Sequence, residues 1–147
     1  MLDATEIEAR VRESFGRQSI MTTLGAEIVA VRSGEVEIVL PFSDKILKQH
    51  NFIHAGAVAT IADSARGYAA LTVMPRDAAV LTTEFKINLL APAKGERLRA
   101  IGRVIRGGKK LIVTLGDVFA EEGGARKQVA LIVATMMVVN TGTGLRD

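Results

Sequence analysis

The sequence contains no cysteine, and aromatic residues make up only 4% of its 147 residues, with no tryptophan and one tyrosine. The lack of cysteine excludes a disulfide scaffold, a thiolate metal site and a cysteine nucleophile. The shortage of aromatic side chains means that aliphatic residues must build the core. Basic residues exceed acidic ones only slightly, 19 against 16, which does not by itself indicate a nucleic-acid partner.

Signals for secretion or membrane insertion are also missing. The first six residues have neither the basic start nor the apolar run of a secretory signal. The longest apolar stretch, residues 55–74, carries Asp63 and Arg66 near its middle, and a lipid-spanning helix rarely carries both. We therefore expect a soluble cytoplasmic protein with no membrane partner.

Hydrophobic residues make up 48% of the chain and charged residues 24%, which is the composition of a globular domain. The length suits one domain with its own core, and no repeat or linker interrupts the chain. We predict a single domain over residues 1–147, with an N-terminal helix within residues 1–18 and the core of the fold over residues 24–140.

Apolar periodicity predicts the elements of this domain. Asp3 and Glu6 have the spacing of a capping box, which begins the first helix. A second run with helical period, residues 55–74, is almost entirely small or apolar, so we expect it to be buried on most sides. Alternating apolar and polar residues predict six strands, at residues 26–30, 36–40, 80–89, 98–105, 111–120 and 129–139.

Turns of hairpin composition join these strands, so the fold class is α+β, with an antiparallel six-stranded sheet packed on one long central helix. One helix cannot cover the whole sheet, which suggests a homo-oligomer. In the strand at 80–89, alternation places Thr83 on the apolar face with Phe85, and Thr82 on the opposite face with Glu84. Taken alone, both threonines fit ordinary strand positions.

Asp63 is the only acid between Asp44 and Asp77, and it lies in the middle of the apolar helix. Burial there would remove its solvation and raise its pKa, which makes it a candidate general base or nucleophile. The alternative is an ion pair with Arg66 at i, i+3 on an exposed stripe of the helix. The periodicity favours neither interpretation.

His54, Ala55 and Gly56 begin the same helix. The first backbone N–H groups of a helix lack intrahelical partners, and small residues let a ligand approach them, so a developing oxyanion could bind there. A histidine at this position also fits a loop or packing role. Gln49, in the preceding loop, could bind an acyl carbonyl or a water, although it also fits a surface position.

A basic run lies between Lys94 and Lys110, with seven basic residues and one acid. It fits a solvated face, and it could also attract a nucleotide diphosphate. No aromatic residue alternates with the basic positions, which argues against nucleic acid as the partner. The sequence has no phosphate-binding glycine motif, serine–histidine–aspartate elbow or metal-spaced histidine cluster.

Taken together, residues 49–56 (QHNFIHAG), Asp63, residues 67–70 (GYAA) and residues 82–96 (TTEFKINLLAPAKGE) resemble a hotdog-fold acyl-CoA thioesterase of the PaaI-like, phenylacetic acid degradation type. The resemblance covers about residues 24–139 and includes the order of elements. It implies a sheet wrapped around the central helix and hydrolysis of an acyl- or aryl-acyl-CoA to free acid and coenzyme A.

The resemblance also implies roles for residues. Asp63 would be the general base or nucleophile, and the N–H of Ala55 or Gly56, next to His54, would form the oxyanion site. The loop amide falls on Gln49 and the strand hydroxyl on Thr82. Two positions depart from the family pattern: its His-Gly-Gly is His-Ala-Gly here, and its loop asparagine position holds Lys48, one residue before Gln49.

In this family the site spans a dimer interface, so we expect a homodimer or a dimer of dimers, with no metal and no cofactor besides the coenzyme A of the substrate. Alternative functions are a hotdog hydratase or dehydratase, and a non-catalytic acyl-CoA-binding or regulatory protein. The residues expected to bind the substrate or coenzyme A are Asn51, Phe52, Thr83, Arg106, Gly107 and Lys109.

Overall fold

The computed structural model describes residues 1–140, 142 and 147. Its six strands form one sheet in the order β1-β2-β4-β5-β6-β3, and all neighbours are antiparallel. The helices are α1 (Ala4–Gly16), α2 (Ser19–Leu24), the 3-10 helix η1 (Asp44–Ile46) and α3 (Ala55–Leu71). The strands are β1 (Glu27–Arg32), β2 (Glu35–Pro41), β3 (Ala78–Leu89), β4 (Arg97–Gly107), β5 (Leu111–Glu122) and β6 (Ala125–Asn140).

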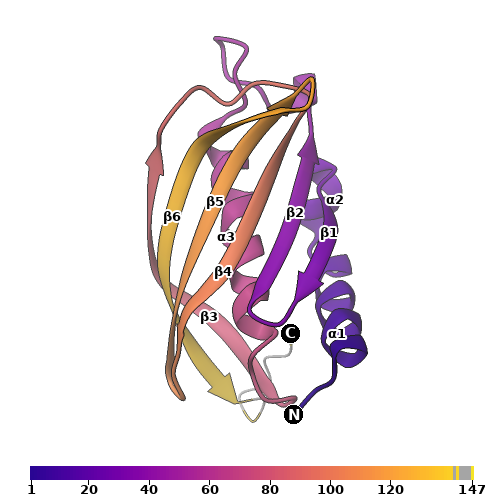
Figure 1. The fold of residues 1–147 in the computed structure, drawn as a ribbon, viewed down its shortest axis with the longest axis vertical. Helices are drawn as coiled ribbons and strands as arrows, with labels where there is room; N and C mark the ends of the chain where they lie inside the picture. The colour runs from indigo at the N-terminus through magenta and orange to yellow at the C-terminus, as the bar shows by residue number, and fades with distance from the viewer. Residues whose placement is uncertain (141, 143–146) are drawn as a thin grey trace.

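The sheet curves around α3, which lies along its inner face (Figure 1). This is the hotdog fold that the sequence predicted. The core between helix and sheet is aliphatic, with Ile61 and Ala65 of α3 fully buried against side chains such as Ile38, Leu98 and Ile132. Among the described residues, no helix combines the length and the apolar character that crossing a membrane requires.

The N-terminal helix α1 begins with the predicted capping box between Asp3 and Glu6. It packs through Ile7 and Val11, and the guanidinium of Arg10 donates hydrogen bonds to three backbone carbonyls, those of Leu71, Met74 and Ala78. These carbonyls belong to the end of α3, the turn that follows it and the start of β3. The N-terminal segment is therefore fastened to the elements that carry the candidate site.

The predicted alternation in β3 is wrong at its centre. A β-bulge between Thr82 and Glu84 inserts one extra residue, which shifts the alternation by one position. Thr82 therefore lies on the inner face with Phe85, where it accepts a hydrogen bond from Arg66. Thr83 points elsewhere: its hydroxyl is exposed and donates to a backbone carbonyl of β6.

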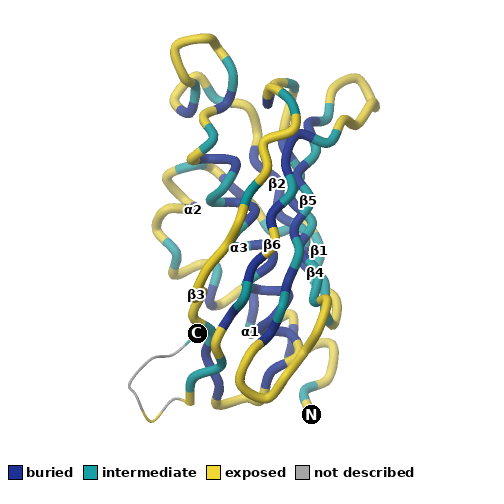
Figure 2. The backbone as a smooth tube through the Cα atoms, turned by 90° about the vertical axis from the view of Figure 1, so that its left-hand side faces the viewer, coloured by how far each residue is buried: buried dark blue, intermediate teal, exposed yellow. Residues whose placement is uncertain are grey.

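Strand β3 is an edge of the sheet, and in the described part of the chain its outer edge pairs with no other strand. Apolar side chains along it are exposed, with Phe85 at 47% and Leu89 at 56%. Figure 2 shows this strand exposed along most of its length beside the buried core. A long unpaired edge of this kind is a template for pairing with another strand.

Candidate active site

The N-terminus of α3 presents one free backbone donor. His54 is the N-cap, and its Nδ1 accepts a hydrogen bond of 2.8 Å from the N–H of Gly56. The next two N–H groups, of Ala57 and Val58, both donate to the His54 carbonyl. Within the described residues the N–H of Ala55 has no hydrogen-bond acceptor. Ala55 is thus the position where an oxyanion could be held.

The loop before α3 folds as a small hairpin. Leu47 and Ile53 form an isolated bridge, and the Lys48 N–H donates to the Phe52 carbonyl at 2.9 Å. Asn51 adopts a left-handed conformation at the turn, with φ 62°, which asparagine tolerates well. Gln49 lies exposed in this turn, and no acceptor or donor for its amide exists among the described residues.

A cavity of about 340 Å³ adjoins the start of α3. Phe52 of the hairpin, Ala55 of the helix and Leu89 of β3 all line it. The structure therefore brings Ala55 and Phe52 together, as a substrate site needs. Gln49 is exposed in the turn, so its role as the amide that binds the acyl carbonyl stays a prediction.

Asp63 and Thr82 lie together further along α3. The carboxylate of Asp63 pairs with Arg66, and the same Arg66 nitrogen, Nη2, donates to the Thr82 hydroxyl at 3.1 Å. The expectation that Asp63 is desolvated is wrong, because its side chain is 41% exposed. Its position on the open side of the helix, beside the edge strand, keeps it in contact with solvent. The carboxylate is both ion-paired and accessible to a reactant.

The sequence suggested that Asp63 is buried, but in the structure the buried side chain of the pair is that of Arg66. Its side chain is 0% exposed, and burial lowers its pKa to about 10, against the opposing effect of the Glu84 charge. The guanidinium carbon lies 5.8 Å from the centre of the Phe85 ring. No partner for its Nε and Nη1 exists among the described residues. A positive charge is therefore held inside the fold against Asp63.

A cavity of about 250 Å³ opens beside Asp63, and α1 forms part of its wall. Gln18 donates a hydrogen bond of 2.8 Å to the hydroxyl of Tyr68 and accepts one from Ser64. Burial raises the pKa of Tyr68. The sequence did not predict this polar group, because nothing in the local pattern shows that a residue just after the first helix reaches the central one.

The two halves of the candidate site are separated along α3. Ala55 and Asp63 lie eight residues apart, which is about 12 Å at the helical rise of about 1.5 Å per residue. A reacting carbon must lie about 3 Å from both its nucleophile and its oxyanion donor. Within one chain these two groups therefore cannot act on the same thioester.

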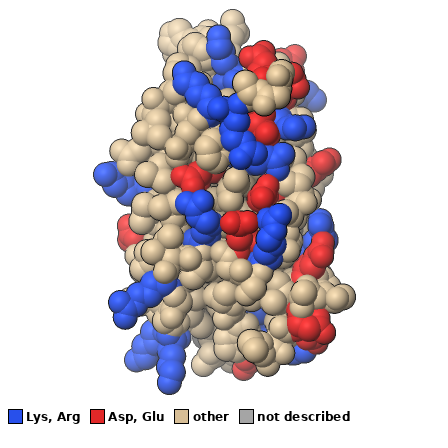
Figure 3. Space-filling view, in the orientation of Figure 1, with Lys and Arg blue, Asp and Glu red and all other residues tan. Residues whose placement is uncertain are grey.

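The predicted basic face is largely neutralised. Arg99 of β4 pairs with Glu37 and Glu121, and Arg103 pairs with Asp117. Figure 3, which faces the outer surface of the sheet, shows positive and negative side chains interleaved there. On this surface the solvated-face interpretation is correct, since the acids of neighbouring strands match the arginines.

Arg106, Gly107 and Lys109 lie where β4 and β5 meet, and no ion pair involves them in the described part of the chain. This hairpin is at the opposite end of the molecule from the start of α3 (Figure 1). One chain therefore does not bring them to Ala55. Among the described residues, no three histidine or acidic side chains lie close enough to hold a metal ion.

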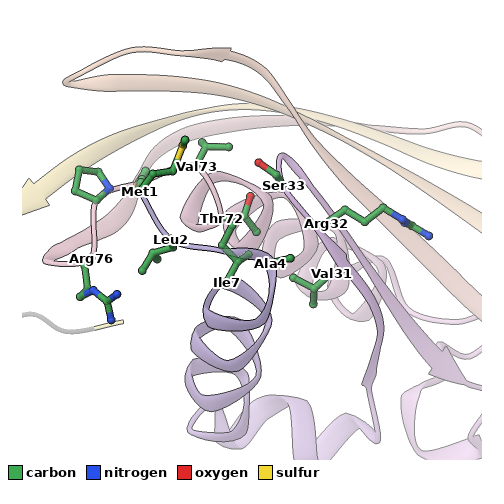
Figure 4. A pocket seen from close by; sticks show the side chains of 12 residues that line it. Met1, Leu2, Ala4, Ile7, Val31, Arg32, Ser33, Thr72, Val73 and Arg76 are labelled. Atoms are coloured by element: carbon green, nitrogen blue, oxygen red, sulfur yellow. The ribbon is translucent and has the colours of Figure 1, made fainter.

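A larger cavity, of about 770 Å³, lies away from these residues (Figure 4). It separates the start of α1, the β1–β2 turn and the end of α3, and its wall is mostly apolar. Its two arginines, Arg32 and Arg76, point away from its centre in Figure 4 and pair with glutamates. None of the predicted site residues lines it.

A protein-family model described as Thioesterase superfamily matches residues 50–127. The chain belongs to the thioesterase superfamily. The match spans the whole of α3, and with it Ala55, Asp63 and Arg66. The enzyme class expected from the sequence, a hydrolase of the thioesterase type, is the class of this superfamily.

Known proteins resemble this chain over most of its length. A thioesterase family protein from Silicibacter pomeroyi is 42% identical, with a TM-score of 0.89 over 91% of this chain and 98% of its own. The curated protein "Putative esterase SSO1253" of Saccharolobus solfataricus is 30% identical over 80% of this chain and 76% of its length. The E. coli PaaI protein from the phenylacetic acid degradation operon is 20% identical, with a TM-score of 0.83 over 91% and 94%, and shares the fold.

Proposed function

We propose that this protein is an acyl-CoA thioesterase of the PaaI-like type, in which Asp63 attacks or activates water. The observation that carries the proposal is the accessible Asp63 carboxylate, held by a buried arginine beside the Thr82 hydroxyl. Acyl transfer needs a base or nucleophile and a donor that holds the oxyanion. Asp63 can supply the first, and the free N–H at the start of α3 the second.

In the water route, Asp63 takes a proton from a water molecule while the water oxygen bonds to the thioester carbon. The carbonyl oxygen gains negative charge and is held by the N–H of Ala55 and the positive end of the helix dipole. When the tetrahedral intermediate collapses, the C–S bond breaks, the thiolate of coenzyme A leaves and a proton neutralises it. In the direct route, the Asp63 carboxylate attacks the thioester carbon, the C–S bond breaks and the thiolate of coenzyme A leaves, and water then hydrolyses the acyl anhydride to free acid and the Asp63 carboxylate.

A second copy of the chain resolves the separation between Ala55 and Asp63. The free edge of β3 allows an antiparallel pair with β3 of another copy. If the two-fold axis passes near Lys86, Thr82 of one copy lies opposite Leu89 of the other, because the bulge adds one residue after Thr82. Asp63 then faces Ala55 of the other copy, and each interface contains two composite sites.

The same symmetry accounts for the distant basic hairpin. An antiparallel pair brings the β4–β5 end of one copy toward the α3 start of the other. Arg106, Gly107 and Lys109 would then lie near the cavity at Phe52 and could bind the phosphates of coenzyme A. In this arrangement Asn51 and Thr83 remain expected contacts at the interface.

A thiol-release assay on a panel of acyl- and aryl-acyl-CoA substrates tests the proposal. We expect turnover of at least one member, with equal amounts of free acid and thiol. Binding of acyl-CoA without hydrolysis of any member would instead establish a non-catalytic binding protein.

A further inference from the structure

Two glycines fix the part of α3 that carries Asp63 close to the sheet. A Cβ on Gly102 of β4 would lie 2.2 Å from the backbone nitrogen of Arg66, and one on Gly116 of β5 would lie 3.4 Å from the Ala62 carbonyl. Only glycine allows the approach at Gly102. The helix backbone at Arg66 is thus set against the sheet, and the side chain runs inside the fold toward β3.

Among the described residues, only one of the three guanidinium nitrogens of Arg66 has hydrogen-bond partners. Its Nη2 donates to both Asp63 and Thr82, which joins the central helix to the edge strand. Its Nε and Nη1 have no partner in the described part of the chain, although the side chain is fully buried. Burying a cation against one half-exposed carboxylate lowers stability, because the lost hydration is only partly replaced. A structural role alone does not account for this arrangement.

We propose that Arg66 is a positioning residue for Asp63, which keeps the carboxylate ionised and in one orientation beside Thr82, at a cost in stability. This inference rests on the proposed thioesterase function. An adjacent positive charge favours the ionised form of an acid, which is the form that a base or nucleophile needs. The double contact through Nη2 also removes the rotational freedom that an accessible aspartate otherwise has.

Few other charges act on this pair. Glu84 on β3 is the other acid whose charge reaches Arg66. Tyr68 of α3 and Asp147 line the cavity beside Asp63, and so do the uncharged Ser14 of α1 and Gln18, the N-cap of α2. Along the middle of β4, β5 and β6, the residues that face α3 are apolar, glycine or threonine, such as Gly102, Thr114 and Ala134, and the charged inward positions Glu122 and Lys127 lie at the β5–β6 turn. Arg66 is therefore the main charge that controls Asp63.

The test compares Arg66→Met, which removes the charge and retains the volume, with wild type. We expect kcat to fall about 10- to 100-fold, as misplaced catalytic groups do, with KM within about two-fold. The acidic limb of the pH profile of kcat should move to higher pH, because the positive charge beside the carboxylate is gone. Arg66→Lys, which retains the charge, should recover part of kcat and of the acidic limb. Arg103→Met, which breaks an arginine–aspartate pair on the outer face, is the matched control and should leave kcat unchanged.

Thermal unfolding separates positioning from a structural role. Arg66→Met should leave Tm unchanged or raise it, because an under-paired buried cation is removed. Asp63→Asn should lower Tm by about 4 °C or more, and adding Arg66→Met to it should restore Tm. A fall in Tm for Arg66→Met, or an unchanged kcat and pH profile, would overturn the inference.

Failure of the proposed function has a different signature. If wild type hydrolyses no substrate of the panel, the thioesterase proposal fails and this role of Arg66 fails with it. If wild type is active and Arg66→Met matches it in kcat and pH profile, only the role of Arg66 is rejected.

Discussion

Arg99 on the outer face of the sheet and Arg66 of α3, on the inner side, differ in their acidic partners and in the direction in which their pKa is shifted. Arg99, on the outer face of β4, donates hydrogen bonds of 2.8 Å to both Glu121 and Glu37. Burial alone would lower its pKa, but the hydrogen bonds to these two acids outweigh it and raise the pKa. Arg66, on the inner face, has one half-exposed acid, and burial lowers its pKa to about 10.

The contrast between the two arginines is a contrast between a charge that stabilises the fold and a charge that serves the candidate site. On the outer face, each arginine is placed where carboxylates of neighbouring strands match it, so the charges support the sheet. On the inner face, a cation is kept with two unpaired N–H groups next to an accessible acid. Unfavourable arrangements that persist in a folded protein tend to mark functional sites. Substitutions on the two faces should therefore have opposite consequences.

The largest effect is expected on the inner face, from Asp63→Asn. Removing the ionisable group takes away the base or nucleophile, so kcat should fall about 100- to 10,000-fold. The measurement is thiol release with the best substrate of the panel, on protein whose folded state is verified by circular dichroism. Turnover within a few-fold of wild type would leave the ion pair with Arg66 as the whole role of Asp63.

Ala55→Pro tests the oxyanion donor at the other end of the same helix. Proline suits the first helical position and lacks an N–H, and His54 before it already has the extended ψ of 138° that a residue before proline requires. The change thus deletes one donor with little effect on the helix. We expect kcat to fall about 100- to 1,000-fold. Ala55→Ser, which keeps the N–H, is the control and should retain activity.

The sequence predicted the inner face in part. The i, i+3 spacing of Asp63 and Arg66 correctly indicated an ion pair, and helical periodicity placed both in the central helix. It assigned the burial to the wrong partner, because periodicity does not show that Gly102 lets the helix approach the sheet at Arg66. The bulge that turns Thr82 inward was also invisible, since a single inserted residue leaves the composition of a strand unchanged.

The sequence predicted that the outer face is a solvated, charged surface, but it did not predict which acid pairs with which arginine. A run of basic residues on strands is most often a solvated face, and here it is one. The matching acids Glu37, Asp117 and Glu121 come from three positions far apart in the sequence, and only the strand order brings them beside the arginines. The hairpin residues without acidic partners, Arg106 and Lys109, could not be told from the paired ones.

A mixed dimer examines whether the inner face is completed by a second copy. Co-refolding equal amounts of Ala55→Pro and Asp63→Asn chains gives about half heterodimers, each with one intact composite site and one site with both lesions. Roughly a quarter of wild-type activity should return. Mixtures no more active than the mean of the two parents would show that each chain holds a complete site.

A smaller effect is expected for the unpaired basic hairpin. In the double variant Arg106→Ala, Lys109→Ala, KM for acyl-CoA should rise several-fold with kcat nearly unchanged, because exposed cations contribute about 1 kcal/mol or less each to anion binding. The rise should be largest at low salt and shrink as salt screens the phosphates. Arg97→Ala, which removes a basic residue already paired with Glu121, is the control. An unchanged KM at low salt would remove the hairpin from the coenzyme A site.

The smallest effect, and the one that completes the contrast, is expected from Glu121→Gln on the outer face. Burial tends to raise the pKa of Glu121, but hydrogen bonds from Arg99 and Arg97 outweigh it and hold the pKa below its usual 4.5. A depressed acid stabilises the fold above pH 4.5, and this contribution disappears as pH falls through the lower pKa of the folded state. At pH 7, Glu121→Gln should therefore lose about 1 kcal/mol of unfolding free energy in urea, and its stability should approach that of wild type as the pH falls below 4.5. Glu8→Gln, which breaks an exposed pair on α1, should change stability little at either pH. Thioesterase activity at pH 7 should be the same in all three proteins, and a loss of activity in Glu121→Gln would mean that the outer face also serves the site.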